Sequence, residues 1–289
     1  RDYHAQGYAY EQMAILFRTN LGIRFVMDAL MKGGIPFHMK DAIPNLFAHW
    51  ISLDIIAYLR LVSGTGNTRA NWLRIMNRPN RYIKREALAP FTSDISVAQL
   101  KAYYQDKDWM LERLDRLEYD LSIMKRMSPY AAIHYLSNAM KYQDYLKDYA
   151  KEHHINEQEL LDVLNAVHES SQSCRTFAEW FTYIDTYTEE LQKQAKSPAS
   201  KDANNESGVC LCTLHCAKGL EYPIVFIPDI NEDNIPHARA AVDADLEEER
   251  RLFYVGITRA KEHLHLYCVG EASGKEKFPS RFLEELNEM

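Results

Sequence analysis

Residues 209–227 read VCLCTLHCAKGLEYPIVFI, and this stretch decides the fold. Two apolar runs, Val209 to Thr213 and Ile224 to Ile227, predict short buried strands. A hydroxyl, an imidazole, a cation, a glycine and a carboxylate lie between them. Ligands of open α/β sheets bind at the carboxyl ends of strands, so the segment after Thr213 is a candidate site. The alternative is a plain polar loop between two strands.

Strands alternate with helices toward both ends of the chain. Further strands are expected at Met13 to Phe17, Ile35 to Met39 and Leu264 to Val269, and helices at Leu21 to Met31, Trp50 to Val62 and Asp245 to Tyr254. The middle predicts helices alone, at Tyr103 to Met127, Pro129 to Ala150, Glu157 to Ser170 and Thr176 to Gln194. This alternation indicates an α/β fold with a mainly parallel sheet. The sheet domain comprises residues 1–95 and 206–289, and a mostly α-helical domain, 96–205, is inserted between them.

Composition limits the class of protein. The 289 residues are 46% hydrophobic and 26% charged, with five cysteines and a net charge of −7. These values are typical of a soluble globular protein of the reducing cytoplasm, and no apolar run approaches the roughly 20 residues of a membrane span. A negative chain must bind nucleic acid through local patches.

Three cysteines beside a histidine invite a zinc site, which we discount. Cys210, Cys212 and Cys216, with His215, lack the usual spacing of structural zinc ligands, and the first two alternate along a predicted strand. We expect buried thiols and no metal.

A second polar constellation, EEERRLFYVGITRA, occupies residues 247–260. Acidic residues begin a helix, where the macrodipole favours them, and Gly256 interrupts the apolar pattern just before Arg259. An arginine placed there can reach the charge that develops on a transferring phosphoryl group. The alternative is a solvated helix face with ion pairs between successive turns.

The two constellations, in this order, resemble the fifth and sixth motifs of superfamily 1 DNA helicases of the UvrD, Rep and PcrA type. AILFRTN (14–20) resembles the fourth motif, LRIMNRPNRYIKREAL (73–88) the segment entering the inserted domain, and FPSRFLEEL (278–286) the close of the motor core. The resemblance implies a second RecA-like domain that carries the helical domain as an insertion.

It also implies roles for individual residues. Phe17 matches an aromatic residue that stacks on adenine, Arg18 and Arg259 match arginine fingers that approach the γ-phosphate, and Glu221 matches a carboxylate near the ribose. Thr213 and His215 match contacts to the single-strand backbone, and Lys218 lies in the same loop. The cofactor of the intact protein is then ATP with Mg²⁺, with none held tightly by this chain.

Two elements of an ATP site are missing. No stretch reads G-x-x-x-x-G-K-[ST], the pattern of a phosphate loop, and Val225 to Asp229 only partly resembles a strand ending in a metal-binding carboxylate. We therefore expect a fragment that is inactive alone and needs the N-terminal helicase half as its partner.

One departure concerns duplex DNA. The family commonly has an R-G-I-G turn where this chain reads Arg81-Tyr82-Ile83-Lys84, and glycines there allow close approach to a phosphate. The surrounding basic cluster, which includes Arg78 and Arg81, can substitute electrostatically for that contact. The alternative is a solvated, positively charged helix end.

The resemblance implies the C-terminal portion of an ATP-dependent DNA helicase, and the 3′ to 5′ direction is expected from the resemblance alone. Expected partners are single-stranded and duplex DNA, with repair or transcription proteins and no membrane. The alternative is a non-catalytic interaction or regulatory module that keeps this fold.

Overall fold

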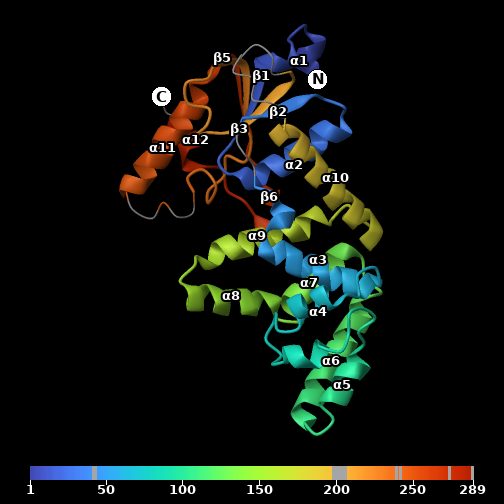
Figure 1. Ribbon diagram of the computed structural model, residues 1–289. Helices are drawn as coiled ribbons and strands as arrows, with labels where there is room; N and C mark the ends of the chain where they lie inside the picture. The colour runs from blue at the N-terminus through green and yellow to red at the C-terminus, as the bar shows by residue number, and fades with distance from the viewer. Residues whose placement is uncertain (41–43, 197–206, 238–239, 241–242, 273–274, 288–289) are drawn as a thin grey trace. The chain divides into compact units, whose positions relative to one another are not determined.

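The computed structural model describes residues 1–40, 44–196, 207–237, 240, 243–272 and 275–287. Its contacts form two compact units: unit 1 comprises Arg1–Pro44 with Gln192–Met289, and unit 2 comprises Asn45–Leu191 (Figure 1). Unit 2 therefore takes in residues 45–95, which the sequence analysis assigned to the sheet domain. The reason is that α3 (Trp50–Ser63) packs against later helices of the chain, α6 (Asp108–Met124), α7 (Pro129–Asn138) and α9 (Glu157–Ser170). No helix in the described part of the chain is long and apolar enough to cross a bilayer.

Unit 1 is built on a parallel sheet, as predicted. The strand order is β2 (Phe37–Met39), β3 (Val209–Thr213), β1 (Met13–Phe17), β4 (Tyr222–Ile227) and β5 (Ala260–Leu266). The two sequence segments interleave, because β1 lies between β3 and β4. A short antiparallel pair joins β6 (Glu271–Ala272) to β7 (Lys275–Glu276). The last strand of the sheet begins four residues before the predicted Leu264, because Ala260 already pairs with Tyr222.

Helices cover the sheet of unit 1. They are α1 (Asp2–Ala5), η1 (Tyr10–Gln12), α2 (Asn20–Lys32), α11 (Asp243–Ile257) and α12 (Arg281–Asn287). Leu252 and Phe253 of α11 and Phe282 of α12 join a buried apolar core with alternate residues of β1 and β3.

Gly256 brings α11 into close contact with this core. A Cβ atom at that position would lie 2.4 Å from Leu214 Cδ2 and 3.2 Å from Ile227 Cδ1. Leu214 and Ile227 are both fully buried, so neither can move aside without disturbing the core. A residue without a side chain is therefore required here.

Unit 2 is helical. Its elements are η2 (Leu46–Ala48), α3, α4 (Arg69–Ile75), η3 (Arg85–Leu88), α5 (Val97–Tyr103), α6 (Asp108–Met124), α7 (Pro129–Asn138), α8 (Tyr142–His153), α9 (Glu157–Ser170) and α10 (Phe177–Lys196), whose end crosses the unit border. The prediction of one helix from Pro129 to Ala150 is wrong. Lys141 takes a left-handed conformation, φ 60°, which ends the first helix and precedes the second.

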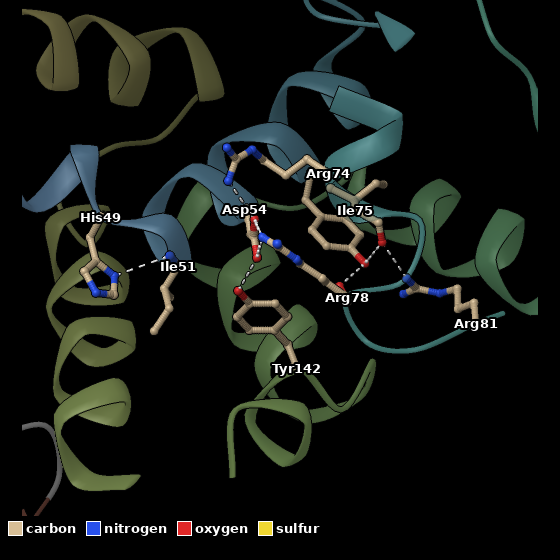
Figure 2. Close-up of polar contacts among 9 residues, drawn as sticks. His49, Ile51, Asp54, Arg74, Ile75, Arg78, Arg81 and Tyr142 are labelled. Atoms are coloured by element: carbon tan, nitrogen blue, oxygen red, sulfur yellow. Dashed lines mark hydrogen bonds and ion pairs between the residues drawn. The ribbon is translucent and has the colours of Figure 1, made fainter. Parts of the chain in front are cut away.

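A buried carboxylate links three segments of unit 2 (Figure 2). Asp54 of α3 is fully buried and accepts hydrogen bonds from Arg74 Nη1 at 3.0 Å, Arg78 Nη1 at 2.8 Å and the Tyr142 hydroxyl at 2.9 Å. Burial raises the pKa of Asp54, and the charge of Arg78 opposes the rise. The cluster ties α3 to α4, to the loop after α4 and to α8.

We expect Gly256→Ala to destabilise unit 1. Overpacking a core costs about 1–3 kcal/mol, and the better helix propensity of alanine returns up to about 1 kcal/mol. A net loss of about 1–2 kcal/mol should speed hydrogen exchange of the β3 and β4 amides by about 5- to 30-fold. Gly270→Ala is the control, since nothing lies within 4 Å of its Cβ position. Equal exchange in the two variants would contradict the close contact.

Asp54→Ala should destabilise unit 2 by about 3–5 kcal/mol, because it leaves two arginines and a tyrosine without their shared acceptor. All four tryptophans, Trp50, Trp72, Trp109 and Trp180, belong to unit 2, so urea unfolding followed by tryptophan fluorescence reports on this unit. Asp115→Ala is the matched control: that carboxylate is 64% exposed in its ion pair with Lys101, and its loss should matter far less. The explanation fails if both variants unfold at the same urea concentration.

Candidate functional site

The residues between β3 and β4 form a short connection, here called the crossover segment (residues 214–221). The Leu214 N–H donates to the Phe17 carbonyl at 2.8 Å, and the Leu220 N–H donates to the Ala217 carbonyl at 3.0 Å. Leu214 and Ala217 are fully buried, whereas His215 and Lys218 are exposed. The segment is thus anchored by apolar residues and presents polar ones to solvent.

The cysteines near this segment differ in burial. Cys210 and Cys212 of β3 are buried, as expected. Cys216 is exposed, so the expectation of a buried thiol there is wrong, because it lies on the outward side of the crossover segment.

Three of the predicted nucleic-acid contacts lie together at the carboxyl edge of the sheet. Thr213 is the last residue of β3, and its Oγ1 accepts a hydrogen bond from the Cys216 N–H at 3.3 Å. His215 and Lys218 follow within five residues. An imidazole and an ammonium group on an exposed turn can both donate to phosphate oxygens.

Arg259 and Glu221 lie at the opposite, amino edge. Each directly precedes a strand, and the first residues of those strands, Tyr222 and Ala260, are paired. Arg259 Nη1 donates to the Leu220 carbonyl at 2.9 Å and Nε to the Val255 carbonyl at 2.8 Å. Glu221 is exposed and pairs with Lys261 at 3.1 Å. The structure therefore brings a guanidinium and a carboxylate to one edge, attached to the far end of the crossover segment.

Arg18 has a different environment. It follows β1 at the carboxyl edge, and its Nε donates to Glu249 Oε2 at 2.8 Å in a bidentate ion pair. The His237 N–H donates to the same oxygen at 3.1 Å. Burial alone raises the pKa of Glu249, but the hydrogen bonds from Arg18 and His237 outweigh it and hold this pKa below its usual range.

A pocket of about 440 Å³ adjoins this ion pair. Its lining residues are Arg18, His237, Ala240, Asp245, Glu248 and Glu249. Among the described lining residues, three carboxylates and one guanidinium face the pocket.

The sheet places the backbones of Arg18 and Arg259 at opposite edges. Met13 of β1 lies level with Ile224 of β4, and Ala260 of β5 lies level with Tyr222. Arg18 is therefore about eight residues, or about 26 Å along the strands, from the level of Arg259. The Arg18 guanidinium itself pairs with Glu249 in the middle of α11, the helix that ends two residues before Arg259, and the approach of both arginines to one γ-phosphate stays a prediction.

Phe17 is buried beside the start of α2. Its side chain is 3% exposed, and a Cβ atom on Gly22 would lie 3.3 Å from its ring. The ring is therefore covered within unit 1, and its stacking on adenine stays a prediction.

Arg78 and Arg81, expected to bind nucleic acid, are engaged inside unit 2. Arg78 pairs with Asp54, and its guanidinium lies 5.6 Å from the centre of the Trp50 ring. Arg81 Nη1 donates to the Ile75 carbonyl at 3.0 Å (Figure 2). Both side chains therefore stabilise the fold around α4.

The sequence did not reveal the two carboxylates that pair with Arg18 and Arg78. Glu249 is one of three successive glutamates, and Asp54 lies within an apolar helix. The sequence held one signal for the second pair: Asp54 is a carboxylate within an apolar helix, and a buried carboxylate needs cationic partners.

The fold, a five-stranded parallel sheet in a chain that also carries a helical unit, is that of a RecA-like domain with a helical insertion. The chain belongs to the family of UvrD-like helicase C-terminal domains, which matches residues 2–270. It is 30% identical over 292 residues to YjcD of Bacillus subtilis (strain 168), covering 97% of this chain and 37% of the relative. It is 29% identical to the ATP-dependent DNA helicase PcrA of Staphylococcus epidermidis, covering 98% of this chain and 40% of the relative. The chain thus spans about two fifths of the length of these relatives.

The Arg18–Glu249 ion pair should stabilise unit 1 in a pH-dependent way. Because the folded-state pKa of Glu249 is lowered, its contribution is present above the unfolded value of about 4.3 and is lost as the pH falls through the folded value. The difference in unfolding free energy between the wild type and Glu249→Gln, measured by urea unfolding with far-UV circular dichroism, should therefore shrink below about pH 4.3. Glu248→Gln, whose carboxylate is 72% exposed, should give a flat difference. A Glu249→Gln difference that stays constant down to pH 3 would refute this role.

Proposed function

We propose that this chain is the part of an ATP-dependent DNA helicase that completes the ATP site and holds the translocated single strand. One observation carries the proposal. The crossover segment joins the predicted strand contacts at one edge of the sheet to the predicted nucleotide contacts at the other. Membership of the helicase family supports the same assignment.

The amino edge suits a nucleotide. The Arg259 guanidinium can donate to phosphate oxygens and stabilise the charge that develops as the γ-phosphoryl group is transferred. The Glu221 carboxylate can accept hydrogen bonds from ribose hydroxyls. ATP bound with Mg²⁺ supplies the phosphoryl group, and the N-terminal helicase half supplies the phosphate loop.

The carboxyl edge suits a single strand of DNA. Thr213, His215 and Lys218 bind its phosphates without reading bases, so binding is independent of sequence. A change at Arg259 reaches His215 through the buried anchors Leu214 and Ala217. This coupling converts hydrolysis into movement along the strand, in the 3′ to 5′ direction that the resemblance implies.

Arg18 has a structural part in this scheme. Its ion pair with Glu249 fixes the middle of α11, the helix that ends two residues before Arg259. A non-catalytic interaction module is the competing function, and the same experiment tests it.

The test is DNA-stimulated ATP hydrolysis by the full-length product of the gene. Arg259→Ala should lower kcat by about 10³-fold or more, the range for loss of an arginine finger. Arg18→Ala, the matched control, should retain most of the activity wherever it stays folded.

Negligible hydrolysis by the wild type would favour the interaction module. If the folded Arg18→Ala protein loses as much activity as Arg259→Ala, then Arg18 contacts the nucleotide and the separation of the two edges is wrong.

A further inference from the structure

Two exposed aromatic rings in unit 2 enclose an arginine. The Arg113 guanidinium lies 4.9 Å from the centre of the Tyr82 ring and 5.2 Å from the centre of the Trp109 ring. Tyr82 is 59% exposed and Trp109 is 50% exposed. Arg113 lies one helical turn after Trp109 on α6, and Tyr82 comes from the loop between α4 and η3. We call these three residues the aromatic clamp.

The loop that carries Tyr82 is held firmly. Asn77 Oδ1 accepts a hydrogen bond from the Ile83 N–H at 2.9 Å, and Asn77 Nδ2 donates to the Ile83 carbonyl at 2.9 Å. The Lys84 N–H donates to the Tyr104 hydroxyl at 2.7 Å, and Ile83 is buried. These bonds fix the backbone on one side of Tyr82, and Asn80 accepts the N–H of Tyr82 itself at 3.1 Å.

Tyr82 adopts a conformation that tyrosine disfavours. Its φ is 60°, in the left-handed region where a side chain clashes with its own backbone and glycine is favoured. Strain of this kind persists where the surroundings impose it and often marks a functional position. Here the strained residue gains no burial, because most of its ring faces solvent. The ring is thus held outward at the expense of local stability.

Charge also favours a ligand. Among the described residues, no carboxylate forms an ion pair with Arg113. The acidic Asp115 and Glu118 of the same helix pair instead with Lys101, both at 2.6 Å. Lys84 and Arg85 are exposed just beyond Tyr82, whereas Asp108 and Glu112 each lie one position from a clamp residue and so about 100° round the helix. The clamp therefore presents a positive charge between two open rings.

We propose that the aromatic clamp binds unpaired bases of single-stranded nucleic acid. Each ring has one face against Arg113 and can offer the other to a base, while Arg113 and Lys84 attract the phosphates. Bases within a duplex are already stacked on each other, so they offer no face to these rings. The inference takes only its class of ligand, single-stranded nucleic acid, from the proposed function. The aromatic clamp is a second binding site, separate from the one at Thr213 and His215. The rings need little ordering on binding, because Arg113 and the loop already fix them.

The experiment compares binding of two fluorescein-labelled probes, an oligothymidylate of about 16 nucleotides and an abasic strand with the same phosphates. Fluorescence anisotropy is measured without nucleotide on the wild type, Tyr82→Gly, Trp109→Ala and Tyr119→Ala. Tyr82→Gly relieves the backbone strain as it removes the ring, so this variant should fold at least as well as the wild type. Tyr119→Ala is the control, because Tyr119 is 60% exposed on the same helix and lies outside the clamp.

We expect Tyr82→Gly and Trp109→Ala to weaken oligothymidylate binding by about five-fold or more, with abasic binding unchanged and Tyr119→Ala like the wild type. Three outcomes overturn the proposal: unchanged oligothymidylate binding in Tyr82→Gly, equal losses for both probes, or preferential binding of a blunt duplex. If His215→Ala weakens binding while Tyr82→Gly does not, the clamp is wrong and the proposed function stands. A loss of stability in Tyr82→Gly with no loss of binding would make the clamp a packing feature only.

Discussion

The close approach of α11 to Leu214 is the contact on which unit 1 depends. It exists because Gly256 has no side chain and Leu214 cannot move within a filled core. Leu214 lies between Thr213 and His215, and Gly256 lies three residues before Arg259. A single packing contact therefore sets the position of both edges of the site. Any change that separates α11 from the crossover segment moves the two groups of polar residues relative to each other.

Arg78, Arg18 and Arg259 were all predicted to contact a phosphate, but they differ in the partners of their guanidinium groups. Arg78 neutralises a fully buried carboxylate together with Arg74, so its removal leaves the desolvation of Asp54 only partly compensated. Arg18 pairs with Glu249 where both side chains are mostly covered, 17% and 11% exposed. Within the described part of the chain, Arg259 donates to uncharged oxygens alone, two backbone carbonyls and the Thr258 hydroxyl. A guanidinium without a carboxylate partner retains the most attraction for a phosphate.

The sequence predicted β1 and β3 to the residue, since an apolar run of five that ends in polar residues has few other interpretations. It also predicted the parallel sheet and the helical insertion. It missed the partners of Arg18 and Arg78, because Glu249 is 231 residues from Arg18 and Asp54 is 24 residues from Arg78. The left-handed conformations of Lys141 and Tyr82 were equally hidden, because neither residue type favours φ near 60°. The local pattern of apolar residues thus predicted the strands and helices. Contacts between residues distant in sequence decided which charged side chains remain able to bind a ligand.

The interleaved order of the sheet has a consequence during synthesis of the chain. Ala14 of β1 pairs with Cys210, which emerges from the ribosome 196 residues later. At about 5–20 residues per second, β1 therefore waits about 10–40 s with both of its edges unpaired. Unit 2 is contiguous in sequence, so it can fold within that interval. A long-lived apolar edge is prone to aggregation, so β1 is the most exposed element of unit 1 until β3 and β4 arrive.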